Sequence, residues 1–184
     1  MPATKKITRE MILEAGINVV RDAGFGAINA RSIALKAHIS TQPIYQEFSN
    51  MMELKREIRD EIYKLAEERI QEYSSLGAEY EYMAYGLGFV KFAREERQLF
   101  RYMYLDDDNG EGTKVSPDYE EIIRKMTHSM GMSREKCERF HRDMTLYTLG
   151  LAVAAYTGSM SFSDEELKDC FAGQYRALMI LYGE

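Results

Sequence analysis

The fold is decided by residues 24–48, which read GFGAINARSIALKAHISTQPIYQEF. Apolar residues recur there at helical spacing on both sides of a short break, which predicts two short helices joined by a tight turn. Such a turn often requires a residue with positive φ, and that place falls to His38; histidine is one of the few residues other than glycine enriched in this conformation. The pattern is typical of a helix-turn-helix, which places its second helix in the DNA major groove.

Polar residues stand where these two helices should begin. Asn29 can cap the first and Ser40 the second, because a side-chain oxygen can accept a hydrogen bond from a free amide of the first turn. Pro43 is tolerated in that turn, although it disfavours helical geometry at the preceding residue, so the second helix is expected to start late. The residues expected to be carried inward are Ile33, Ala34, Ala37, Ile44, Tyr45 and Phe48.

The rest of the chain is also predicted to be helical. Thr8 can cap a first helix that ends at Gly24, and Asn50 can cap a long helix to about Gly77, with Glu53 in a capping-box position. The fold class is therefore all-α, with about nine helices: a three-helix head on a larger helical body. The long helix should bury Leu54, Ile58, Ile62, Leu65 and Ile70. The later helices are expected near 80–94 and 96–105, from Pro117 to about Gly131 after a loop at 106–116, from Ser133 to about Ser159, and at 164–182, where Ser163 can cap the last helix.

Composition limits the class of protein. No apolar run approaches the roughly 20 residues that span a bilayer, and no apolar stretch follows the N-terminal lysines as a secretory signal requires. Two cysteines are too few for a disulfide framework, so we expect a cytoplasmic protein. The net charge of −6 divides into +2 for residues 1–50 and −8 for the remainder, which would orient the head toward phosphate.

The second helix of the motif exposes side chains that can read bases. Glutamine can pair bidentately with adenine, and threonine or an apolar ring can contact a thymine methyl group. Basic residues, a tyrosine hydroxyl and the open start of the long helix are expected to contact phosphate. The predicted DNA-contacting residues are Lys5, Lys6, Arg31, Lys36, Ser40, Thr41, Gln42, Pro43, Tyr45, Gln46, Asn50 and Met51.

The head resembles the DNA-binding domain of the TetR family of transcriptional repressors, without a gap from Thr8 to Leu54. The arrangement Ser-x4-Tyr-x2-Phe that ends the third helix is its most specific part. Family members usually have Gly in place of His38, His in place of Glu47 and Lys in place of Met51. An acid at Glu47 should repel phosphate, so DNA binding is weak, or Glu47 turns away, or Gln46 and the N-terminal arm compensate. The resemblance rests on Thr8-Arg9-Glu10, Ile12-Leu13, Ala15, Gly24-Phe25, Ala27, Arg31, Ile33-Ala34, Ala37, Ile39-Ser40, Tyr45, Phe48 and Leu54.

For the body, the resemblance implies an effector pocket and a homodimer whose last two helices pair with their copies. It divides the chain into a DNA-binding domain at 1–50 and an effector-binding and dimerisation domain at 51–184. Tyrosine, phenylalanine and methionine between helices suit an apolar or aromatic effector with a few polar groups, although most such residues form core. The predicted effector residues are Tyr82, Tyr85, Phe89, Phe92, Phe100, Met103, Tyr104, Tyr119, Met126 and Tyr147, and the predicted interface residues are Leu149, Val153, Tyr156, Phe171, Tyr175 and Leu178.

No catalytic set, metal site or cofactor site is predicted, because the sequence has no Ser/His/Asp arrangement, no phosphate-binding glycine loop and no metal-grade Cys/His cluster. We therefore expect a ligand-responsive repressor released from a palindromic operator, and not an enzyme. Two alternatives stay open. One is a ligand-sensing dimer whose head no longer reads DNA, because of Glu47 and Met51. The other is a helical enzyme that uses the aromatic pocket, with His141 or a tyrosine as the base.

Overall fold

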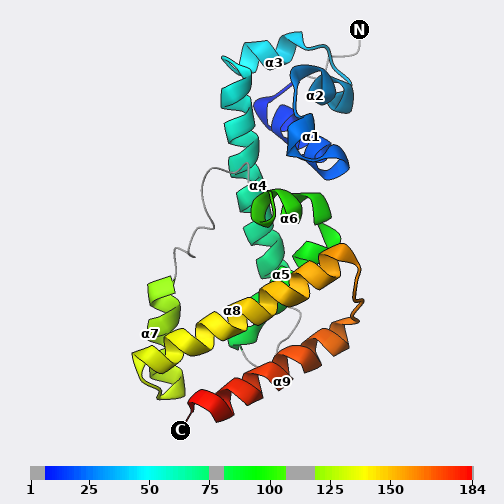
Figure 1. Cartoon of the computed structure of the whole chain (residues 1–184). Helices are drawn as coiled ribbons and strands as arrows, with labels where there is room; N and C mark the ends of the chain where they lie inside the picture. Colours follow the sequence, from blue (N-terminus) through cyan, green and yellow to red (C-terminus); the bar gives the residue numbers. More distant parts are fainter. Residues whose placement is uncertain (1–6, 75–80, 107–118, 184) are drawn as a thin grey trace. The chain divides into compact units, whose positions relative to one another are not determined.

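The computed structural model describes residues 7–74, 81–106 and 119–183, and within these ranges the fold is all-α and contains no strand (Figure 1). None of the described helices is long and apolar enough to cross a membrane. The described residues form nine α-helices and one short 3-10 helix: α1 Arg9–Ala23, η1 Phe25–Ala27, α2 Ala30–Ala37, α3 Gln42–Glu47, α4 Met51–Ser74, α5 Glu81–Glu95, α6 Arg97–Tyr104, α7 Tyr119–Met130, α8 Arg134–Thr157 and α9 Asp164–Tyr182.

The chain packs into two units. Unit 1 comprises residues 1–68 and 96–106, and unit 2 comprises residues 69–95 and 107–184. Unit 1 therefore holds the three-helix head together with most of α4 and all of α6. This division follows packing, whereas the predicted boundary at residue 50 separates functions. The two differ because α4 and α6, which come later in the sequence than the head, complete the core of unit 1.

The core of unit 1 forms where α1, α2, α3, α4 and α6 contribute apolar side chains. In α4 the buried stripe is Leu54, Ile58, Ile62, Ala66 and Ile70, all at most 1% exposed, and the last of these already belongs to unit 2. The prediction of Leu65 in this stripe was wrong, because strict i+4 spacing brings Ala66 to the centre and leaves Leu65 at the margin, half-buried. On α6, Tyr102 stacks on Phe25 with ring centroids 4.1 Å apart.

Local capping chemistry sets the helix ends of unit 1 largely as predicted. The Thr8 side chain accepts a hydrogen bond from the Met11 amide, and Gly24 ends α1 with a φ of 81°. Asn29 and Ser32 form a reciprocal capping box at the start of α2. His38 ends α2 in the left-handed conformation, with a φ of 56°, so the predicted positive φ in the turn is confirmed.

The prediction that Ser40 caps the third helix was wrong. The residue before α3 is Thr41, and neither its side chain nor another makes the capping bond. Pro43 contributes to this result by removing one of two possible donors, because an N-cap side chain bonds to the second or third amide of the helix. Pro43 has no N–H, so it removes the third-position donor for Ser40 and the second-position donor for Thr41.

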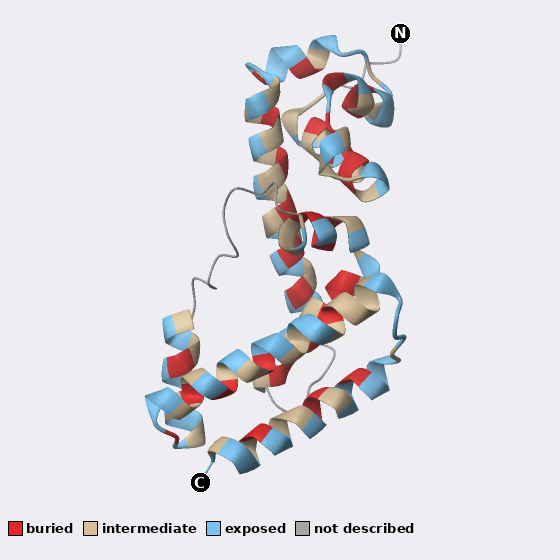
Figure 2. Ribbon diagram, viewed as in Figure 1, coloured by how far each residue is buried: buried red, intermediate tan, exposed pale blue. Residues whose placement is uncertain are grey.

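Unit 2 is built from α5, α7, α8 and α9 with the C-terminal end of α4, residues 69–74. Phe92, Phe140 and Phe171 are fully buried in it, and Figure 2 shows the alternation of buried and exposed positions along α8 and α9. Two glycines of α5 allow close packing. A Cβ on Gly86 would lie 2.7 Å from the Phe171 ring, and a Cβ on Gly88 would lie 2.2 Å from the Ile70 carbonyl oxygen.

A buried cation fixes the start of α9 on α5. Lys91 is 5% exposed, and its ammonium group donates to the Asp164 carboxylate at 2.5 Å. Arg94, one turn further on, donates to the Phe162 carbonyl and to Asp164, both at 3.2 Å. Ser163 and Glu166 form a capping box at this end of α9, as Ser163 was predicted to do. These contacts from α5, together with the cap of α9, hold the short connection between α8 and α9.

Candidate nucleic-acid interface

The exposed face of α3 carries the predicted base-reading side chains. Thr41, Gln42, Tyr45 and Gln46 are exposed, while Ile44 is 1% exposed and anchors the helix in the core of unit 1. A helix held by one apolar residue and presenting amide and hydroxyl groups outward has the chemistry of a recognition helix. The inward position predicted for Tyr45 was wrong, because the residue is 59% exposed.

The residues predicted to contact phosphate differ in their exposure and in whether a neighbouring side chain already pairs with their charge. Arg31 is exposed on α2, whereas Lys36 forms a 2.5 Å ion pair with Asp22 of α1, which offsets its charge. Ser40 is exposed beside the turn, and Pro43 is half-buried. Lys5 and Lys6 lie outside the described residues, as do Pro117 and most of the predicted 106–116 loop.

The start of α4 is already partly occupied by its own cap. The Asn50 side chain accepts hydrogen bonds from the amides of Met52 and Glu53, each at 2.9 Å. These are two of the amides expected to attract phosphate at this helix end. Met51 is half-buried and adds no charge there. The first turn of α4 therefore presents fewer unbonded amide donors and less positive charge to an anion than an uncapped turn with a lysine would.

Arg9, which no sequence pattern singled out as a site residue, joins α1 to the end of α3 and to α4. Its Nε and Nη2 donate to Glu57 Oε2 at 2.9 Å and to Glu53 Oε1 at 2.8 Å on α4. Its Nη1 donates to the backbone carbonyl of Glu47, and its guanidinium lies 4.0 Å from the centroid of the Phe48 ring. These partners are 38 to 48 positions away in the sequence, so local spacing gives no signal of the contact.

Glu53 is held in its charged form. The hydroxyl and amide of Ser49 donate to its carboxylate, and Arg9 donates to it as well, so the pKa of Glu53 falls from 4.5 to about 2. Hydrogen bonds to Glu57 and, next, to Glu53 raise the pKa of the Arg9 guanidinium above its usual value. Because the folded-state pKa of Glu53 is depressed, its stabilising contribution is present above about pH 4.5 and is lost as the pH falls toward 2.

We therefore expect Glu53→Gln to be less stable than the wild type at pH 7, with a gap that narrows steadily as the pH is lowered through 4 toward 3. Urea unfolding at four pH values, followed by circular dichroism, measures this gap. Glu61→Gln is the control, because it removes only an exposed ion pair with Lys64 in the same helix. A Glu53→Gln gap that stays constant down to pH 3 would contradict the described contacts.

The predicted effector residues are divided between the two units. Phe100, Met103 and Tyr104 belong to unit 1, and the other seven belong to unit 2. Phe92, Phe100 and Met126 are at most 3% exposed and are core residues of their units. Tyr85 is largely exposed, and Phe89, Met103 and Tyr104 are half-buried. Burial raises the pKa of the Tyr104 hydroxyl to about 12.

Unit 2 brings some of the predicted residues together around His141. The Tyr82 hydroxyl and His141 Nδ1 share a hydrogen bond of 2.7 Å, and the ring centroid of Tyr119 lies 5.6 Å from that of His141. Tyr175 of α9 and Phe140 of α8 have ring centroids 5.4 Å apart and complete the cluster. Burial lowers the pKa of His141 and raises that of Tyr82, so both groups are held neutral at pH 7. Tyr147 lies apart from them, with its hydroxyl 3.4 Å from the Cys170 carbonyl.

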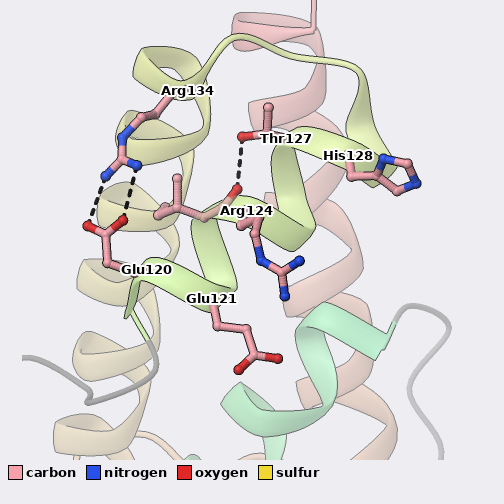
Figure 3. A pocket seen from close by; sticks show the side chains of 7 residues that line it. Glu120, Glu121, Arg124, Thr127, His128 and Arg134 are labelled. Carbon is pink, nitrogen blue, oxygen red and sulfur yellow. Dashed lines mark hydrogen bonds and ion pairs between the residues drawn. The ribbon is translucent and has the colours of Figure 1, made fainter.

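An open depression of about 750 Å³ lies elsewhere on unit 2, on α7 and the start of α8 (Figure 3). Its described lining is mostly charged, and Arg134 donates twice to Glu120 across it, at 2.9 and 3.0 Å. None of the ten predicted effector residues is among Glu120, Glu121, Ile123, Arg124, Thr127, His128 and Arg134, which line it. Its chemistry is unlike the apolar pocket predicted from the sequence.

The predicted interface residues fall into two groups. Leu149 is exposed, and Val153, Tyr156 and Tyr175 are half-buried, so these four are accessible on unit 2. Phe171 and Leu178 lie inside the core of the unit, at 0% and 5% exposure. The same two helices expose three further apolar side chains that the prediction did not include among its interface residues, Leu146, Ile180 and Leu181, and the connection between the helices exposes Met160.

Comparison with known proteins identifies the fold. No model of a known protein family matches the chain, and no curated protein sequence matches it. Solved structures do, and the match described next shows that the chain has a TetR-like fold. One is the crystal structure of a candidate TetR-family transcriptional regulator from Mesorhizobium loti MAFF303099, which matches with a TM-score of 0.57 over 97% of this chain and 100% of that one, at 17% identity. The predicted all-α, TetR-like fold is confirmed.

Proposed function

We propose that the chain is a homodimeric transcriptional regulator that represses from a palindromic DNA site and leaves it when a small apolar or aromatic effector binds. The observation that carries this proposal is the exposed polar face of α3, with Thr41, Gln42 and Gln46 outward and Ile44 inward. The left-handed turn at His38 supports it, because that turn gives a helix-turn-helix its angle. Residues 1–50 are the proposed DNA-binding domain and residues 51–184 the effector and dimerisation domain.

The proposed dimer surface is the outer face of α8 and α9. Leu149, Val153, Tyr156 and Tyr175 are accessible there, and Leu146, Ile180 and Leu181 extend the apolar surface. Apolar side chains exposed on two adjacent helices are typical of a surface that a partner covers. Two identical heads would then read two half-sites about 34–36 Å apart on one face of the duplex.

The proposed effector site is the cluster of Tyr82, Tyr119 and His141 in unit 2. Rings with polar tips can contact an apolar or aromatic ligand and still donate or accept one hydrogen bond each. An effector acts by binding one conformation of the dimer better than another, so it selects a head spacing that no longer fits the operator. We infer that α4 carries this change, since it contributes residues to both units.

Binding selection from random-sequence duplexes tests the proposal. The chain is mixed with the library in the presence of excess non-specific competitor, and bound duplexes are recovered and sequenced over several rounds. We expect one sequence family with two-fold symmetry to be enriched. If no sequence is enriched above competitor, the chain is a ligand-sensing dimer without DNA reading, and the proposal is wrong.

Glu47 offers a separate test of how the head meets phosphate. Its side chain is exposed at the end of α3, while Arg9 holds its backbone carbonyl. We expect Glu47→Gln to strengthen binding to selected and unrelated duplexes by the same factor, about 3-fold to 10-fold at 0.1 M salt, because it removes a charge that repels the backbone. Fluorescence anisotropy titrations measure this factor. Unchanged affinity would mean that Glu47 points away from the DNA.

A further inference from the structure

The recognition helix of this head needs support from outside itself. It has six residues, and its first turn makes no side-chain capping bond. Isolated helices of this length are unstable in water, so its direction depends on what holds its two ends. The N-terminal end follows the turn at His38, and the centre is anchored by Ile44. The C-terminal end meets one charged side chain.

That side chain is Arg9. The last carbonyls of a helix have no partner within the helix, and Arg9 Nη1 donates to one of them, the Glu47 carbonyl. The same planar group lies over the ring of Phe48, which caps α3 and is 2% exposed. A guanidinium combines these two contacts because its donors lie in one plane and its face is free to stack.

The remaining donors of Arg9 bind α4. Glu57 accepts from Nε and Nη2, and Glu53 accepts from Nη2. Glu53 also accepts from the Ser49 amide at 2.8 Å, so the short link between α3 and α4 joins the same network. All of these residues belong to unit 1.

We propose that Arg9 is a positioning residue, which fixes the C-terminal end of α3 to the first two turns of α4 so that the direction of the recognition helix follows α4. The consequence for DNA reading rests on the proposed function, whereas the mechanical part rests only on the contacts of unit 1. A movement of α4 is then transmitted to the base-reading side chains of α3 through Arg9, and it does not require repacking of the core of the head.

Hydrogen exchange tests the mechanical part without DNA. Arg9→Gln is compared with Arg21→Gln, a matched control on the same helix, because Arg21 makes a two-bond ion pair with Glu96, the residue before α6, and its described hydrogen bonds include none to α3 or α4. In Arg9→Gln we expect the amides of α3 and that of its C-cap, Phe48, which donates to the Ile44 carbonyl, to exchange about 10-fold faster relative to those of α1. In Arg21→Gln that ratio should equal the wild-type ratio.

DNA binding tests the consequence. We expect Arg9→Gln to lower the ratio of specific to non-specific affinity about 10-fold, and Arg9→Lys, which keeps the charge but loses the planar fork, to recover little of it. If Arg9→Gln does not fold, Glu57→Gln, which weakens two of the bonds, replaces it in both experiments. Equal α3 exchange ratios in the Arg9 and Arg21 variants would overturn the inference. A wild type without sequence preference would overturn the proposed function alone.

Discussion

Replacing Gly88 by alanine is expected to destabilise the protein by about 3 kcal/mol or more, which lowers the melting temperature by roughly 6–12 °C for a chain of this size. The added Cβ would lie 2.2 Å from the Ile70 carbonyl oxygen and 2.7 Å from Ser74 Oγ. The serine side chain can rotate, but the carbonyl belongs to the backbone of α4 and cannot move without it. Alanine's higher helix propensity returns only about 1 kcal/mol, so the overlap dominates.

Thermal and urea unfolding measure the effect of Gly88→Ala. The control is Gly26→Ala, where an added Cβ meets no atom within 4 Å and the backbone is not left-handed. That variant should stay within about 0.5 kcal/mol of the wild type. A Gly88→Ala protein as stable as the Gly26→Ala control would show that α4 and α5 do not approach each other as described.

Replacing Gln46 by alanine is expected to weaken binding to the selected DNA site by about 10-fold to 100-fold while leaving non-specific binding unchanged. Gln46 is exposed on α3, and an amide that pairs with adenine contributes about 1–3 kcal/mol of discrimination at one base pair. Thr41→Ala should act in the same direction with a smaller effect, because a methyl contact carries less discrimination than two hydrogen bonds.

Competition titrations with selected and scrambled duplexes measure both affinities. Arg31→Ala is the matched control, because Arg31 is exposed on α2 and is expected to contact phosphate. It should weaken binding to every sequence equally and reduce the slope of log K against log salt by about 1. If Gln46→Ala behaved like Arg31→Ala, α3 would contact the backbone only, and the base-reading role would belong to other residues.

Sequence signals were sufficient where the chemistry is local. The caps at Thr8, Asn29 and Ser163 and the left-handed turn at His38 each depend on a few adjacent residues, and each is present in the structure. Ser40 shows where the preference of serine for the N-cap position fails, because Pro43 has no N–H at the third helical position to bond to it.

Contacts between distant segments were not predictable from spacing. Arg9 meets residues 38 to 48 positions away, and nothing near it in the sequence indicates them. The apolar pattern of α9 predicts that one face of the helix is buried, but it does not distinguish burial inside the unit from burial against a partner. Phe171 lies in the core because Gly86 of α5 leaves room for its ring, whereas Ile180 is 76% exposed and available to a partner.

The spacing of the two half-sites tests the central claim, that a symmetric dimer reads DNA through its two α3 helices, most directly. The selected palindrome is compared with a variant that carries five extra base pairs at its centre, which turns one half-site by about half a helical turn. Affinity and stoichiometry are measured by anisotropy and sedimentation at fixed salt. We expect two protomers on the original duplex, and a loss of at least about 100-fold in affinity on the lengthened one. Equal affinity for both duplexes, or one protomer per site, would contradict the account.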